Sequence, residues 1–157
     1  MPDGLRGLVL GPAEGLSVDN PVGGSLTFKV RGHETGGGLL ALETIAAVGE
    51  GPPLHIHANE HELLYVLDGR FQFRLDEEVR AGSAGTCMYV RRGVAHTWRN
   101  VGDAPGRMLV IFTPAGMEDF FEQFAEHAGA VTAPEAFTRL GSDAGMTVVG
   151  PPLSGAS

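Results

Sequence analysis

The chain has 157 residues, a formal charge of −8 and a hydrophobic fraction of 43%, which is enough apolar material for one domain with its own core. Its basic residues form no cluster larger than Arg91-Arg92, and this argues against nucleic acid as a partner. No apolar run reaches the ~20 residues of a membrane-spanning helix. The first residues also lack the charged and apolar regions of a signal peptide, so we expect a cytoplasmic protein that does not bind membranes.

The first 25 residues are rich in Gly and Pro and weakly patterned, and they predict an N-terminal arm that packs on the surface or on another subunit. From residue 26 onward, short stretches alternate apolar and polar side chains, which is typical of strands with one buried face. Asp68-Gly69 predicts a hairpin turn between two of them. The predicted strands are residues 26–30, 39–47, 62–67, 70–76, 86–90, 96–101 and 107–113.

After Pro114 the pattern becomes helical, with Gly129 as the expected end of a first helix. Thr132 and Glu135 form a capping-box pattern that predicts a second short helix. We therefore predict an N-terminal arm (1–25), an antiparallel β-barrel (26–113) and a C-terminal helical segment with a tail (114–157). The apolar stripe of the first helix, expected to pack against the barrel, is Met117, Phe120, Phe121 and Phe124.

Three histidines and one glutamate predict a metal site. His55 and His57 lie two residues apart, so on one extended strand their side chains point the same way. Glu62 follows at the start of the next strand, and His96 comes from a distant strand. Three imidazoles and a carboxylate suit Fe²⁺, Mn²⁺, Ni²⁺, Cu²⁺ or Zn²⁺ rather than Ca²⁺ or Mg²⁺. We expect one such divalent transition metal, with positions left open for water or substrate.

Other side chains are expected to surround this site. Trp98 follows His96 by two residues and should share its face, so it is a candidate for the pocket wall. Leu64, Phe73 and Met88 are further candidates for an apolar lining. Cys87 is expected to be a small core residue.

Two segments of the chain have a distinctive spacing, which reads Gly49-x5-His55-x-His57-x4-Glu62-x6-Gly69 and Gly85-x5-Arg91-x-Gly93-x2-His96-x3-Asn100. They resemble the two sequence motifs of the cupin superfamily. The second departs at Arg91, where the family usually has proline, and a slightly looser turn is expected there. The resemblance covers residues 26–113 and implies a double-stranded β-helix, or jelly roll, with His55, His57, Glu62 and His96 as metal ligands.

The segment after the last predicted strand and the closing Gly150-Pro151-Pro152-Leu153 look like the small bacterial cupins called quercetin 2,3-dioxygenase-like. That resemblance implies a metal-dependent dioxygenase that uses O₂ to act on a flavonol-like or other enol or polyphenol, with Glu62 as general base. One alternative is a non-oxidative isomerase, cyclase, lyase or decarboxylase of a small metabolite. The other is a cupin that binds metal or ligand without catalysis. A homodimer is expected because the arm and the edge strands of small cupins are commonly shared between subunits.

Overall fold

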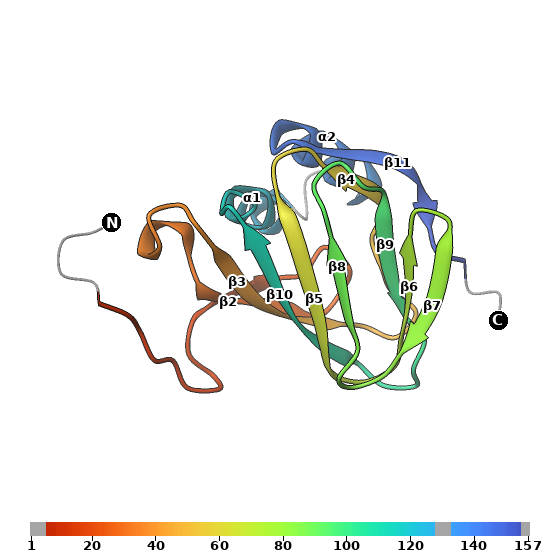
Figure 1. Cartoon of the computed structure of the whole chain (residues 1–157), viewed down its shortest axis with the longest axis horizontal. Coiled ribbons are helices and arrows are strands. Elements are labelled where there is room, and N and C mark those ends of the chain that lie inside the picture. Colours follow the sequence, from red (N-terminus) through yellow and green to blue (C-terminus); the bar gives the residue numbers. More distant parts are fainter. Residues whose placement is uncertain (1–5, 128–132, 155–157) are drawn as a thin grey trace.

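The computed structural model describes residues 6–127 and 133–154 (Figure 1). Two antiparallel sheets face each other across the core, so the predicted all-β jelly roll with short C-terminal helices is confirmed. No helix in the described part of the chain is long and apolar enough to cross a membrane. The strands are β1 (Leu16–Asp19), β2 (Ser25–Val30), β3 (Leu40–Ala46), β4 (Pro53–His57), β5 (His61–Asp68), β6 (Phe71–Leu75), β7 (Glu78–Gly82), β8 (Cys87–Val90), β9 (His96–Asn100), β10 (Gly106–Thr113) and β11 (Met146–Pro152).

The two sheets have six and five strands. The larger follows the order β1-β2-β3-β10-β5-β8, and the smaller follows β11-β4-β9-β6-β7. A short 3-10 helix (Gly32–Glu34) separates β2 from β3. The period-two pattern explains the core, because in β5 the buried Leu64 and Val66 alternate with more exposed residues. In β6, Phe71 and Phe73 are buried in the same way.

Asp68-Gly69 does not close a hairpin, so this part of the sequence-based interpretation was wrong. Strand β5 pairs with β10 and β8 in the larger sheet, whereas β6 pairs with β7 and β9 in the smaller one. Both edges of β5 are therefore taken, and the turn carries the chain from one sheet to the other. Gly69 has a φ of 100°, a conformation that favours glycine.

The C-terminal segment contributes helices and a further strand. Helices α1 (Glu118–His127) and α2 (Ala133–Asp143) pack on each other through Phe120 and Phe137, whose ring centroids are 5.1 Å apart. Strand β11, which the sequence analysis did not expect, pairs with β4. Figure 1 shows these elements together at one end of the barrel. The expected helix end at Gly129 and cap at Thr132 lie outside the described residues.

The N-terminal segment also contains a strand. Strand β1 pairs with β2 at the edge of the larger sheet. The residues before it run away from the barrel, where Val9 is 95% exposed (Figure 1). Strands β1 and β11 lie outside the predicted barrel segment (26–113). Each nevertheless pairs with a barrel strand, β1 with β2 and β11 with β4.

Candidate metal centre

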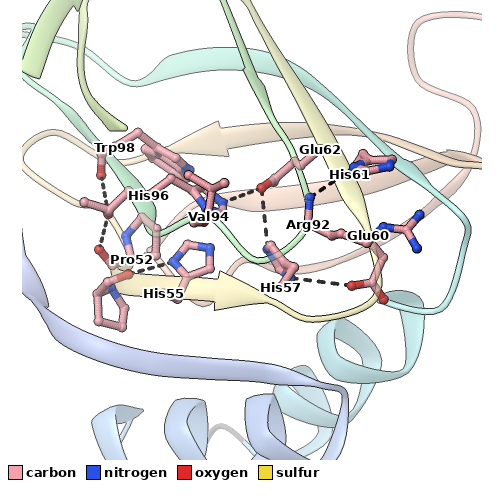
Figure 2. Close-up of polar contacts among 12 residues, drawn as sticks. Pro52, His55, His57, Glu60, His61, Glu62, Arg92, Val94, His96 and Trp98 are labelled. Carbon is pink, nitrogen blue, oxygen red and sulfur yellow. Dashed lines mark hydrogen bonds and ion pairs between the residues drawn. The ribbon is translucent and has the colours of Figure 1, made fainter. Parts of the chain in front are cut away.

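The tertiary structure brings His55, His57, Glu62 and His96 into one buried cluster. Strand β4 supplies the first two, β5 supplies Glu62 and β9 supplies His96. His55 and His96 are direct cross-strand partners. Each residue offers one ligand atom, and these atoms all lie within 4.8 Å of one another. Each residue is at most 6% exposed, and Figure 2 shows the side chains converging from the three strands.

Backbone carbonyls orient two of the imidazole rings. His55 Nδ1 donates to the carbonyl of Pro53 at 2.7 Å, and His96 Nδ1 donates to that of Val94 at 3.0 Å. In each ring this leaves Nε2 as the atom that faces the cluster. His96 Nε2 lies 2.7 Å from Glu62 Oε1.

Burial and the neighbouring charges set the protonation of the cluster. Burial, together with the imidazoles of His96 and His57, lowers the pKa of His55 to about 3, so this ring is neutral. Burial would raise the pKa of Glu62, but its contacts with His57 and His96 outweigh that effect and hold the pKa below its usual range. For His96, burial would lower the pKa, but the hydrogen bond to Glu62 raises it. Imidazoles ligate metals in the neutral form and carboxylates in the ionised form. His55 and Glu62 are therefore in their ligating states, whereas metal binding at His96 would displace the proton between its Nε2 and Glu62.

Unsatisfied polar atoms show that these residues fit a metal ion. Both ring nitrogens of His57 are buried without a hydrogen-bond partner, and so is Oε2 of Glu60. Such orphaned groups cost about 1–3 kcal/mol each in a folded protein. Three imidazole nitrogens and one carboxylate oxygen form a donor set that suits divalent transition metals, so the cluster is a candidate metal site.

An apolar cavity adjoins the cluster. It has a volume of about 60 Å³ and is lined by residues that include His55, His57 and Glu62. That volume accommodates a few water molecules or a compact organic group. Much of its wall is apolar or aromatic and comes from both sheets and both helices, including Trp98, Val110, Phe112, Met117, Phe120 and Phe137.

The structure places the predicted lining residues differently. Trp98 is among the residues that line the cavity. Leu64 is fully buried in the core and does not line the cavity, and Phe73 and Met88 line a separate surface hollow beside β7 and β8. These three side chains on β5, β6 and β8 are buried but lie outside the cavity lining, and the alternating pattern alone does not distinguish the two kinds of position.

Two further expectations concern residues near the site. Cys87 is exposed, because β8 turns Met88 and Val90 inward and Cys87 outward, so its assignment to the core was wrong. Glu60, in the turn between β4 and β5, is 4% exposed and was missed by the sequence analysis. Burial raises the pKa of Glu60 above its ordinary value. Its only sequence signal was its position three residues after His57.

Comparison with known proteins finds a family similarity within the barrel. Residues 42–112, from β3 to β10, match the family model described as "Cupin domain". The match includes all four residues of the candidate metal site.

The similarity to individual proteins is partial. An uncharacterised protein of Methanocaldococcus jannaschii is 32% identical over 78 residues, which are 49% of this chain and 62% of that protein. The Streptomyces cyaneus polyketide synthase CurC is 33% identical over 66 residues, 42% of this chain and 43% of that protein. The matches therefore span less than two thirds of the length of these relatives. A crystal structure titled a predicted oxalate decarboxylase from Thermotoga maritima shares the fold, with a TM-score of 0.55, 20% identity and coverage of 57% of this chain and 79% of that one.

Proposed function

We propose that this chain is a cupin and works as a metal-dependent dioxygenase that acts on a small enol or polyphenol. The observation that carries the proposal is the cluster of three imidazoles and a carboxylate at an apolar, largely aromatic cavity. A substrate of this class has an apolar body for the cavity wall and oxygen atoms for the metal. The similarity of 66 residues to the Streptomyces cyaneus polyketide synthase CurC supports an enolisable substrate.

In this proposal the site residues have three roles, which are metal binding, proton acceptance and exclusion of water. His55, His57 and His96 hold the metal, and a divalent transition metal bound there would anchor and polarise a substrate oxygen. Glu62 is the fourth donor of the cluster, and its carboxylate is also placed to accept the proton of a substrate hydroxyl. Trp98 and the other apolar wall residues exclude bulk water from the reacting atoms.

The cavity volume sets the size of the substrate. A volume of about 60 Å³ is too small for a whole flavonol, so a flavonol-like ligand requires that the helices covering the cavity move outward. A compact enol, or a catechol-sized ring, needs less movement. We therefore favour a substrate smaller than a flavonol.

The experiment begins with metal analysis of untagged protein, followed by O₂ uptake with a series of enols from small diketones to flavonols. We expect about one metal per chain and O₂ consumption that falls sharply in Glu62→Gln while metal content is kept. Metal binding with no O₂ uptake for any enol would contradict the dioxygenase proposal.

The second candidate is non-oxidative metal chemistry on a compact metabolite, such as isomerisation, cyclisation, elimination or decarboxylation. The small cavity favours it, because a compact metabolite needs less movement of the wall than a polyphenol does. Turnover without oxygen, retained when zinc replaces redox-active metals, identifies this case. Ligand binding that survives Glu62→Gln, without turnover in either form, identifies a non-catalytic binding protein.

We also propose that the chain forms a homodimer. Tyr65 and Tyr89, on the outer face of β5 and β8, are 41% and 55% exposed. The apolar segment of residues 8–10 projects from the same chain. In a symmetric dimer each copy supplies both features, so the segment of one copy can cover the face of the other. Light scattering after size-exclusion chromatography checks this: we expect a dimer mass, converted to a monomer by Tyr89→Glu, whereas a monomer mass for the native protein would contradict it.

A further inference from the structure

The three imidazoles of the cluster are not oriented in the same way. His55 and His96 each donate from Nδ1 to a backbone carbonyl two residues earlier in the chain. Neither ring nitrogen of the equally buried His57 has a hydrogen-bond partner. The backbone therefore fixes two of the three rings and leaves the third without an anchor.

The carboxylate of Glu60 lies beside His57 Nδ1, the atom that in the other two rings donates to a backbone carbonyl. Its Oε2 is 3.8 Å from His57 Nδ1, whereas Glu62 Oε1 is 3.5 Å from His57 Nε2. Figure 2 shows the two carboxylates approaching opposite sides of the ring. Glu60 is 4% exposed, and its Oε2 has no hydrogen-bond partner either. Two unpaired, complementary polar atoms thus face each other, about 1 Å farther apart than in a hydrogen bond.

We propose that Glu60 is a positioning residue for the metal centre, whose carboxylate accepts a hydrogen bond from His57 Nδ1–H. This inference rests on the proposed metal site. A neutral imidazole carries one proton, so holding it on Nδ1 leaves the lone pair on Nε2, which is the atom that faces Glu62 and the cluster. Glu60 thereby does for His57 what the carbonyls of Pro53 and Val94 do for the other two rings.

A carboxylate accepts a hydrogen bond more strongly than a backbone carbonyl does. Glu60 in this position therefore also strengthens the imidazole of His57 as a donor to the metal.

The test measures Zn²⁺ affinity by competition with a chromophoric chelator for the native protein, Glu60→Gln and Glu60→Leu. We expect affinity to fall about 10- to 100-fold, more for Leu than for Gln, because Gln keeps an acceptor oxygen. The melting temperature of the metal-free protein should stay the same or rise, because an unpaired buried carboxyl has been removed. Glu77→Gln, at a side chain that is 96% exposed, is the matched control and should change neither quantity.

A spectroscopic readout separates positioning from general destabilisation. In the zinc-loaded native protein, we expect a slowly exchanging, low-field imidazole proton from His57 Nδ1 in ¹⁵N-resolved NMR spectra, and Glu60→Leu should remove or shift it. Unchanged zinc affinity in both Glu60 variants would overturn the inference, as would a loss of affinity matched by a lower melting temperature of the metal-free protein. Those results leave the proposed function standing, whereas failure of the native protein to bind any metal would overturn both.

Discussion

The two ends of the barrel interior differ in whether their buried polar groups have hydrogen-bond partners. At the end away from the metal cluster, the fully buried Asn100 donates to the carbonyls of Ala46 and Ala104 and accepts from the amide of Gly102. At the cluster end, His57 and Glu60 hold polar atoms without partners. Native proteins pair nearly all buried polar groups, so the satisfied end has a structural role and the unsatisfied end is suited to a ligand.

The two ends also differ in apolar packing, which is tighter at the Asn100 end than at the cluster end. Phe71, Val66 and Met108 are fully buried at the Asn100 end. The cavity instead adjoins His55, His57 and Glu62 at the other end. Stability should therefore respond most to substitutions at the Asn100 end, and metal or ligand binding to substitutions at the cluster end.

The largest expected effect on stability comes from Phe71→Ala. The ring is completely buried and stacks edge-on to Trp98, so its removal should lower the free energy of unfolding by about 3–5 kcal/mol. Urea denaturation of the metal-free protein measures this. The metal content of the remaining folded protein should be unchanged, and a loss below about 1 kcal/mol would contradict the distinction between the two ends.

His96→Ala should act on the other end. Removing one of three imidazoles should weaken metal binding at least about a hundredfold, or about 2.7 kcal/mol, measured by chelator competition and elemental analysis. The control is His61→Ala, because His61 lies outside the cluster and accepts from the amide of Arg92 through Nδ1. Full metal content in His96→Ala would exclude the proposed ligand set.

Asn100→Ala should destabilise the protein without changing metal affinity. The substitution leaves two carbonyls and one amide without their partner, at a cost of about 1–3 kcal/mol. Thermal unfolding, paired with a zinc titration of the folded variant, tests both halves of this expectation. Weakened zinc binding with unchanged stability would reverse the role assigned to this end.

The smallest effects come from a matched pair of valines. Val66→Leu adds a methylene where packing is complete and should cost about 1–3 kcal/mol. Val110→Leu adds the same group at the cavity wall, so the change should be within about 1 kcal/mol, with weaker binding of the larger enols. Calorimetry of both variants sharpens the comparison, and equal destabilisation would show that the cavity does not relieve packing.

Much of this protein could be predicted locally. Alternation of apolar and polar residues along β5 and β6 predicted strands, and the helical spacing after Pro114 predicted α1, because these periods depend only on backbone geometry. The spacing of the motifs grouped His55, His57, Glu62 and His96, which the fold does bring together. Their role as ligands stays a prediction until metal is measured.

Tertiary structure decided what depends on pairing between distant segments. Asp68-Gly69 has the residues of a tight turn, but only the occupied edges of β5 show that this turn changes sheets. β7 has no buried face and so no apolar alternation to reveal it, while β11 is a strand because β4 offers it an edge. Glu60 became meaningful only once the fold buried it beside an unanchored His57. Local sequence determines which way a side chain alternates, whereas its burial and partners depend on contacts that only the folded chain creates.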